Sequence, residues 1–422
     1  MKDIEHLVKE GKHFCILPWI HFHAWPDKRV MPCCVADSSK PVGEVKPEES
    51  IIQMMNSEQY KEMRQKMLND EPFEACTRCY DLEKIGTWTL RQSNNLGRGL
   101  ANRDLVEATK EDGSIEKFKM KYMDVRFSNI CNMKCRSCGP GCSSLWAEEK
   151  MKYEGMEVFE QYFKTRKMVI TNNEDNTLMT KMLPYLADVE EVYFAGGEIL
   201  ITQEHYDCLD HWLEQGLQNQ VKLSYTTNLS SLKFKDKDLI EYWKKFPKVE
   251  IWASLDAHGD LAELMRKGTD WNKIVENMKL IKEQVPHVEF QITPTISIWN
   301  VFQFPAFFDY MIQHGFIPKN TGPRMNLASS PWYTNVMILP QFAKDKLKQM
   351  YKYYQYKYAY NRDISNGFKM IAFAIESGGP NRDGIKEFFQ SNDIMDERRG
   401  EKLLEVAPEL QEVYDWAFNQ ED

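Results

Sequence analysis

Three cysteines stand close together in the run Cys131-Asn-Met-Lys-Cys135-Arg-Ser-Cys138. The C-x3-C-x2-C spacing lets three thiolates on one loop each bind one iron of a 4Fe-4S cluster, and the fourth iron then has no protein ligand. Such an open iron can bind a small molecule, as the open position of a catalytic zinc does. The spacing by itself also permits a zinc knuckle completed by Cys142.

A second cysteine-rich region lies near the N-terminus. Of the ten cysteines in the chain, five precede residue 80, and the others are the loop cysteines with Cys142, and Cys208. Thiols stay reduced in the cytoplasm, so metal ligation explains such grouping better than disulfides do. Two cysteine-rich regions predict two metal sites, while Cys208, in a helical stretch, is expected to be a small core residue.

The loop and its surroundings require elements that position them. From residue 121 onward, strand-like runs alternate with segments long enough for a crossover helix, which is typical of parallel strands. The expected strands cover residues 122–128, 191–195, 221–227, 249–255, 287–296 and 323–329. This pattern predicts an α/β fold with a partial, TIM-like (β/α)6 barrel.

Three regions follow from this pattern. Residues 1–120 are expected to form an irregular, metal-stapled N-terminal domain with one helix over residues 50–68. Residues 121–340 are expected to form the barrel, and residues 341–422 a helical C-terminal extension.

Polar residues follow several of the expected strands at their C-terminal ends, where barrel active sites lie. The second strand runs into Gly196-Gly197-Glu198, in which the glycines allow close backbone approach and the carboxylate can bind an ammonium group. Asn228 ends the third strand, Ser254 and Asp256 end the fourth, and Arg266 follows. The alternatives are a simple turn at Gly196-Gly197-Glu198, a helix N-cap at Ser254 or Asp256, and a surface position for Arg266.

The cysteine loop after the first strand, with Gly-Gly-Glu after the next, resembles the radical S-adenosylmethionine (radical SAM) superfamily. The resemblance implies that Cys131, Cys135 and Cys138 hold a 4Fe-4S cluster and that Glu198 binds the methionyl amine of S-adenosylmethionine. It further implies cofactor-binding roles for Gly196, Gly197, Asn228, Ser254, Asp256 and Arg266, with the arginine on the methionyl carboxylate. Ser137 departs from the pattern, because an aromatic residue usually precedes the third cysteine.

The N-terminal region, FCILPWIHFHAWPDKRVMPCC followed by CTRCYDLEKIG, is similar to the SPASM/twitch group, whose members carry auxiliary clusters. By this resemblance Cys15, Cys76 and Cys79 bind a second 4Fe-4S cluster, with either Cys33 or Cys34 as the fourth ligand. The segment departs in position, because such elements normally follow the barrel. A structural zinc site at these cysteines is the alternative. His21 and His23 are expected on the hairpin surface.

The resemblance implies a reaction and its partners. A flavodoxin- or ferredoxin-like protein would deliver one electron, S-adenosylmethionine would give methionine and a 5′-deoxyadenosyl radical, and the radical would abstract hydrogen from a peptide or protein residue. The auxiliary cluster would accept an electron or bind the substrate. The alternatives are the same chemistry on a sugar, cyclitol or nucleotide, and a non-enzymatic zinc-binding adaptor.

Composition limits the other partners. The formal net charge of −9 provides no broad basic surface, so nucleic acid is not expected to bind. The sequence contains neither a signal-peptide pattern nor a membrane-spanning apolar run, which predicts a cytoplasmic protein without membrane contact.

Overall fold

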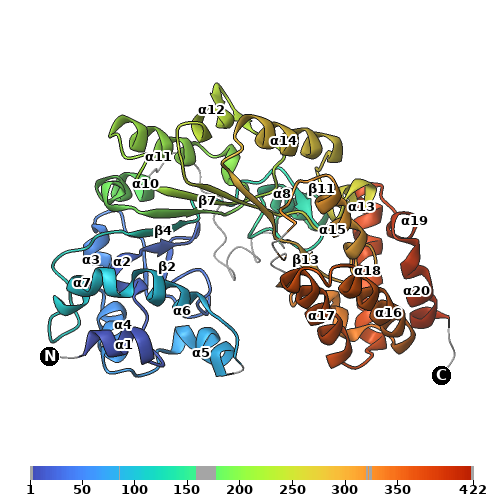
Figure 1. Cartoon of the computed structure of the whole chain (residues 1–422), viewed down its shortest axis with the longest axis horizontal. Helices are drawn as coiled ribbons and strands as arrows, with labels where there is room; N and C mark the ends of the chain where they lie inside the picture. The colour runs from blue at the N-terminus through green and yellow to red at the C-terminus, as the bar shows by residue number, and fades with distance from the viewer. Residues whose placement is uncertain (1–2, 85, 158–176, 320–321, 323–325, 420–422) are drawn as a thin grey trace. The chain divides into compact units, whose positions relative to one another are not determined.

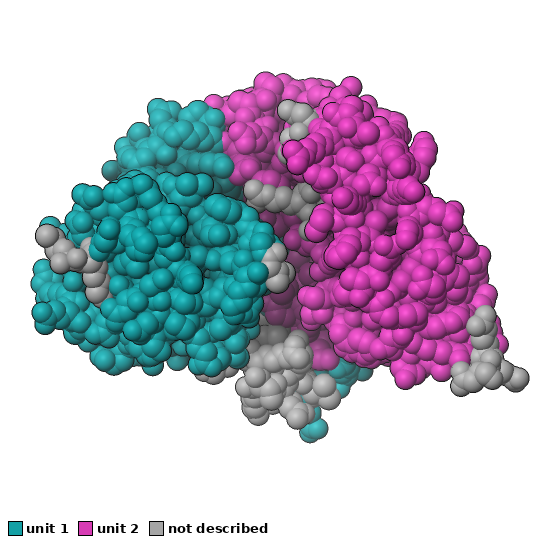
Figure 2. All heavy atoms as spheres, turned by 60° about the horizontal axis from the view of Figure 1, so that its bottom comes forward, with its two compact units in different colours: residues 1–130, 151–224, 245–248 teal, residues 131–150, 225–244, 249–422 magenta. Residues whose placement is uncertain are grey.

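The structure is a computed structural model that describes residues 3–84, 86–157, 177–319, 322 and 326–419 of the 422-residue chain. The chain divides into two units, which Figure 2 distinguishes by colour. Unit 1 contains residues 1–130, 151–224 and 245–248, and unit 2 contains residues 131–150, 225–244 and 249–422.

Five of the expected strands form one sheet in the order β12-β10-β7-β6-β4 (Figure 1). Their bounds are β4 (Tyr122–Val125), β6 (Glu191–Phe194), β7 (Lys222–Thr227), β10 (Val249–Ala253) and β12 (Glu289–Ile292). In unit 1, β4 and β6 pair in parallel with Tyr122 opposite Glu191. In unit 2, β10 and β12 pair in parallel with Glu250 opposite Glu289. The predicted α/β class with a parallel sheet is therefore confirmed.

The last expected strands pair separately. The run 287–296 contains a second short strand, β13 (Thr295–Ile296), which pairs in parallel with β14 (Asn326–Leu327). Residues 323–325 of the sixth expected strand lie outside the described residues. The helices among and after these strands are α8 (Ser144–Glu154), α10 (Thr177–Met182), α11 (Gln203–Glu214), α12 (Leu239–Trp243), α13 (Gly259–Met265), α14 (Trp271–Gln284) and α15 (Phe304–Gln313).

Alternation of apolar residues explains how a strand and its crossover helix meet in unit 1. Val192 and Phe194 are the buried positions of β6. Phe194 packs edge-on against His205 of α11, with ring centroids 4.8 Å apart, and lies 6.3 Å from the Trp212 ring. This contact fixes the segment between β6 and α11, which contains Gly196-Gly197-Glu198.

The N-terminal part of unit 1 contains more helix than the sequence predicted. Its elements are α1 (Ile4–Glu10), α2 (Leu17–Ile20), α3 (Ile51–Met54), α4 (Glu58–Leu68), α5 (Thr77–Lys84), α6 (Leu90–Asn94) and α7 (Arg103–Glu107), with an antiparallel sheet of β1 (His23–Ala24), β2 (Arg29–Met31) and β3 (Gly43–Glu44). The single helix expected over residues 50–68 is two helices, because Ser57 caps the second by accepting a hydrogen bond from the Tyr60 amide.

The C-terminal extension is helical, as predicted. Its helices are α16 (Gln341–Lys357), α17 (Arg362–Ser377), α18 (Arg382–Arg399), α19 (Leu403–Val406) and α20 (Gln411–Phe418), drawn in orange and red in Figure 1. Buried Ile364, Phe368, Ile371 and Ile375 form a stripe along α17 at helical spacing. None of the helices in the described part of the chain has the length and apolar character needed to cross a membrane.

Candidate metal and cofactor sites

The cysteine loop of unit 2 directly follows β4 in the chain. Cys131 and Cys135 are buried and Cys138 is exposed. Residues Lys134–Cys135 form the short strand β5, which pairs in antiparallel fashion with β11 (Arg266–Lys267). The Cys138 amide donates to the Cys135 carbonyl at 3.0 Å. The loop therefore holds its cysteines on ordered backbone, as a cluster-binding loop requires.

Arg266 lies against the loop. Its Nη1 atom is 3.7 Å from the Cys135 Sγ, and its Nε donates to Asp256 Oδ2 at 2.8 Å. The Arg266 side chain is only 14% exposed, so the alternative of a surface arginine is wrong. A hydrogen bond from Cys138, assisted by the Arg266 charge, outweighs the opposing effect of burial and lowers the pKa of the Cys135 thiol to about 7. The loop thus favours a thiolate at Cys135, and a thiolate is the form that binds metal.

Two further strand-end residues of unit 2 belong to the same surroundings. The Asn228 side-chain amide donates to Asn132 Oδ1 at 2.9 Å, which joins the end of β7 to the residue after Cys131. The Ser254 amide donates to the Thr227 carbonyl at 2.8 Å. The N-cap of α13 is His258, so neither Ser254 nor Asp256 caps that helix. Asp256 Oδ1 instead accepts from the Thr295 amide at 2.8 Å.

Gly196-Gly197-Glu198 lies within unit 1, against the backbone that precedes Cys131. The Glu198 amide donates to the Ile130 carbonyl at 2.7 Å. A Cβ atom at Gly197 would lie 2.2 Å from the same oxygen, so only glycine allows this approach. Glu198 as a residue is 2% exposed, and its carboxylate accepts from the Leu200 amide at 3.1 Å. The segment is a close backbone crossing and not a simple surface turn.

Four of the N-terminal cysteines face one another in unit 1. Cys15, Cys33, Cys76 and Cys79 line one small cavity together with Arg91 and Tyr80. Cys15 precedes α2, Cys76 ends the short 3-10 helix Glu74–Cys76, and Cys79 lies in the first turn of α5. Cys34 is not among the lining residues. The geometry therefore favours Cys33 over Cys34 as the fourth thiol, a choice that the sequence left open.

The chemistry of these four thiols fits a metal cluster. Burial raises the pKa of Cys15 to about 12, and burial together with Cys76 and Cys15 raises the pKa of Cys33 well above its ordinary value. Burial likewise raises the pKa values of Cys76 and Cys79. Among the described residues, no group of three or more His, Cys, Asp and Glu side chains could hold a single metal ion. Buried thiols that resist ionisation become ligands when a cationic group lies between them, and the lined cavity provides such a position.

Cys34 belongs to a different buried cluster, which also contains Asp124, His21 and His23. The expectation that these two histidines lie on the hairpin surface is wrong. Burial, and next to it the charge of Asp124 of β4, raise the pKa of the Cys34 thiol well above its ordinary value, and Arg126 Nη1 lies 2.8 Å from Asp124 Oδ1. His21 and His23 are 1% and 0% exposed, not on the hairpin surface. Their Nδ1 atoms lie 3.0 Å and 2.8 Å from the Tyr122 and Asp124 carbonyls, because β1 packs against β4. Burial lowers the pKa of His21 to about 3.

The two remaining cysteines, Cys208 and Cys142, differ in burial. Cys208 is fully buried, with its Sγ 3.7 Å from Met179 Sδ, and is a core residue as expected. Cys142 is exposed. A hydrogen bond with Cys135 and burial raise the pKa of Cys138 well above its ordinary value, and Cys142 adds to this shift.

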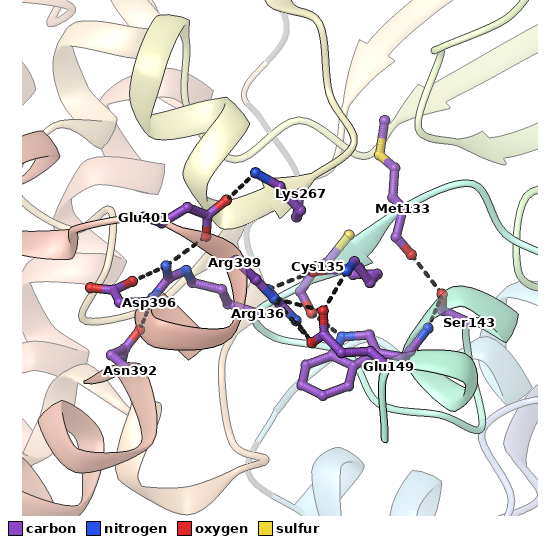
Figure 3. Close-up of polar contacts among 12 residues, drawn as sticks. Met133, Cys135, Arg136, Ser143, Glu149, Lys267, Asn392, Asp396, Arg399 and Glu401 are labelled. Atoms are coloured by element: carbon purple, nitrogen blue, oxygen red, sulfur yellow. Dashed lines mark hydrogen bonds and ion pairs between the residues drawn. The ribbon is translucent and has the colours of Figure 1, made fainter. Parts of the chain in front are cut away.

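Sequence reasoning missed the side chains that fasten the cysteine loop within unit 2. Figure 3 shows Arg136 and Arg399 among carboxylates beside the loop. Trp146 donates to the Cys135 carbonyl at 2.7 Å. Arg136, inside the cysteine motif, was the one available signal, and its side-chain partners Asn392 and Asp396 lie more than 250 positions away along the chain.

Comparisons with known proteins give one family match. Residues 15–80 match the SPASM family, described as an iron-sulfur cluster-binding domain. No curated protein matches the chain. Similar solved structures include native anSMEcpe with bound AdoMet, at 16% identity and a TM-score of 0.39, covering 64% of this chain and 66% of that one. The complex of native anSMEcpe with AdoMet and the Cp18Cys peptide has 16% identity and a TM-score of 0.38, covering 64% and 65%. The chain thus spans just under two thirds of the length of these proteins.

The matched residues are those that contribute Cys15, Cys33, Cys76 and Cys79 to the unit 1 cavity. The SPASM match therefore identifies residues 15–80 as an iron-sulfur cluster-binding segment, and it confirms the predicted resemblance of this segment to SPASM domains.

Proposed function

We propose that this chain is a radical SAM enzyme that abstracts hydrogen from a peptide or protein substrate. The observation that carries the proposal is the Cys131–Cys138 loop, with three thiols after β4 and Arg266 against Cys135. When bound there, a 4Fe-4S cluster with S-adenosylmethionine supplies the 5′-deoxyadenosyl radical. The SPASM match supports an auxiliary cluster and, with it, the choice of a peptide substrate.

The side chains of the loop region have separate roles in this proposal. Cys131, Cys135 and Cys138 bind the core cluster, and Arg266 binds the methionyl carboxylate while Asp256 orients its guanidinium through the 2.8 Å hydrogen bond. Asn228 holds the loop through Asn132, and Ser254 binds the cofactor at the end of β10.

The roles of the other proposed cofactor residues rest on the Gly196-Gly197-Glu198 motif itself. Glu198 accepts from the methionyl amine, and Gly196 and Gly197 allow the backbone to approach the cofactor closely. Cys15, Cys33, Cys76 and Cys79 would hold the auxiliary cluster, which would supply a site to accept an electron from the substrate or to bind it. An external flavodoxin- or ferredoxin-like protein would supply the electron for the core cluster.

The test is anaerobic reconstitution with iron and sulfide, followed by dithionite and S-adenosylmethionine. The wild-type protein should be brown, bind about eight irons, and form 5′-deoxyadenosine and methionine. A variant with Cys131, Cys135 and Cys138 all changed to alanine should keep about four irons and form neither product. A colourless protein with stoichiometric zinc would overturn the proposal.

A second experiment identifies the class of substrate. Extract fractions separated by size are added to the reduced enzyme, and the rate of 5′-deoxyadenosine formation is followed. Stimulation by the peptide and protein fraction, with a mass change in one of its components, supports the proposal. Stimulation by the small-metabolite fraction alone would replace the peptide substrate with a sugar, cyclitol or nucleotide.

A further inference from the structure

We infer that the C-terminal helix α18 positions the core cysteine loop, with Arg399 and Arg136 as the positioning residues. The inference rests on the proposed function, because it concerns how the loop of Cys131, Cys135 and Cys138 holds its cluster. All the residues involved belong to unit 2. Figure 3 shows the two arginines, the carboxylates that bind them and Cys135.

Arg399, the last residue of α18, reaches the loop in two ways. Its Nη1 donates to the Lys134 carbonyl at 3.0 Å, directly before Cys135. Its Nη2 lies 2.8 Å from Glu149 Oε1, and both side chains are almost fully buried. The guanidinium also lies 4.7 Å from the centroid of the Trp146 ring. The Arg399 guanidinium therefore donates to the Glu149 carboxylate and to the Lys134 carbonyl, while its planar face stacks on the Trp146 ring.

Trp146 continues this path to the cysteine itself. Its Nε1 donates to the Cys135 carbonyl at 2.7 Å. The carbonyls of Lys134 and Cys135 are thus both fixed, one by Arg399 directly and the other by the ring on which Arg399 stacks. The backbone of β5 therefore depends on the end of α18.

Arg136 makes the reciprocal connection from the loop to the helix. Its side chain is 0% exposed, and its Nη1 donates to Asn392 Oδ1 of α18 at 2.6 Å. Its Nη2 forms ion pairs with Asp396 and, at 2.8 Å, with Glu401. A buried arginine needs its partners, because an unpaired buried charge is costly. Residues of the C-terminal extension therefore provide the ion-pair and hydrogen-bond partners of Arg136, a residue inside the cysteine motif.

The charges of this network bear on the cluster's potential. Lys134, Arg136, Lys267 and Arg399 are paired with the carboxylates of Glu149, Asp396 and Glu401. One more cation than anion lies beside a loop whose bound cluster would become more negative on reduction. Nearby positive charge favours the more negative state, so the network should raise the reduction potential.

Three variants separate geometry from charge. Arg399→Met removes both, and Arg399→Lys keeps the charge but cannot reproduce the fork. Trp146→Phe removes the hydrogen bond to Cys135 and keeps a smaller aromatic ring for Arg399. Lys402→Met is the matched control, because Lys402 is exposed and pairs with Glu405 at 2.5 Å. Circular dichroism and the unfolding midpoint establish that each variant is folded.

The readouts are the rate of core-cluster loss to a chelator, and the midpoint potential and EPR spectrum of the reduced core cluster. All three measurements use protein that keeps its auxiliary cluster. Arg399→Met and Arg399→Lys should lose the core cluster about tenfold faster than wild type, since each breaks buried charged hydrogen bonds. Trp146→Phe should give a smaller acceleration and an altered EPR spectrum. Only Arg399→Met should lower the midpoint potential, and Lys402→Met should match wild type.

Wild-type rates, potentials and spectra in folded Arg399→Met and Arg399→Lys would overturn the inference. If Arg399→Met does not fold, wild-type rates and spectra in both Arg399→Lys and Trp146→Phe would overturn it equally. A wild-type protein that binds no iron at the Cys131–Cys138 loop would refute the proposed function instead, so the two failures are distinguishable.

Discussion

Arg266 lies directly across a short antiparallel ladder from Cys135, with its Nη1 atom 3.7 Å from the cysteine Sγ. The same guanidinium donates to Asp256 at 2.8 Å. One arginine therefore contacts a cluster-loop sulfur and a carboxylate that orients it. Because a guanidinium carries five donors, these two contacts leave donors for the carboxylate of a bound cofactor.

Substituting Arg266 by lysine should weaken S-adenosylmethionine binding without removing the core cluster. Lysine keeps a positive charge but cannot donate from a planar fork. Loss of a charge-assisted contact costs about 1.5–3 kcal/mol, or roughly ten- to hundredfold in affinity. Glu198→Gln should have an effect of the same size. Equilibrium titration with S-adenosylmethionine checks both variants, with iron content as the control, and unaltered titration curves for both would contradict the assigned roles.

The pair Cys33 and Cys34 offers a matched test of the auxiliary site. Cys33 lines the cavity with Cys15, Cys76 and Cys79, whereas Cys34 is not among the residues that line it. Cys33→Ser should therefore reduce the iron content of reconstituted protein from about eight towards four, and Cys34→Ser should leave it near eight. Iron analysis with EPR of the reduced protein distinguishes them. The reverse result would exchange the two residues, and no loss from either would refute a four-cysteine cluster here.

The strands and the cysteine loop could be predicted because their signals are local. Apolar runs at regular intervals located β4, β6, β7, β10 and β12, and the motif spacing located the loop without knowledge of its neighbours. The apolar runs and the cysteine spacing each depend on residues within a few positions of one another.

The contacts that fasten the sites could not be predicted in this way. Arg399 and Glu149 are 250 positions apart in the chain, and nothing in either segment indicates the other. His21 and His23 alternate with Phe22 as exposed hairpin residues would, yet they are buried because β1 packs against β4. Such burial is decided by tertiary packing, which overrides a local pattern.

Gly197 should not tolerate a side chain. A Cβ atom would lie 2.2 Å from the Ile130 oxygen and 2.7 Å from the Asn129 carbonyl carbon, and backbone atoms cannot yield as a flexible side chain can. Gly197→Ala should therefore lower the free energy of unfolding by about 1–3 kcal/mol. Gly97→Ala is the control, because nothing lies within 4 Å of the added atom. Urea denaturation compares the two, and equal midpoints would show that the crossing is looser than described.

The last prediction concerns pH and His205. Burial lowers the pKa of His205 to about 3, whereas in the unfolded chain a histidine has a pKa of about 6.5. Above pH 6.5 the imidazole is neutral in both states and has no effect on stability. Below pH 6.5 the unfolded chain binds a proton that the folded protein does not, so the free energy of unfolding falls with pH until the folded pKa is reached.

The size of this effect can be stated and isolated. Between pH 7 and pH 5.5, His205 alone should lower the free energy of unfolding by about 1 kcal/mol. His205→Phe keeps a ring against Phe194, which lies 4.8 Å away in the wild type, but cannot bind a proton. Its stability should therefore rise relative to wild type by that amount as the pH is lowered over this range. His211→Phe, at a partly exposed position of the same helix, controls for the loss of a histidine elsewhere on α11. Urea denaturation of anaerobic, fully reconstituted protein at both pH values measures the difference, and parallel pH profiles for wild type and His205→Phe would show that His205 becomes protonated in the folded protein.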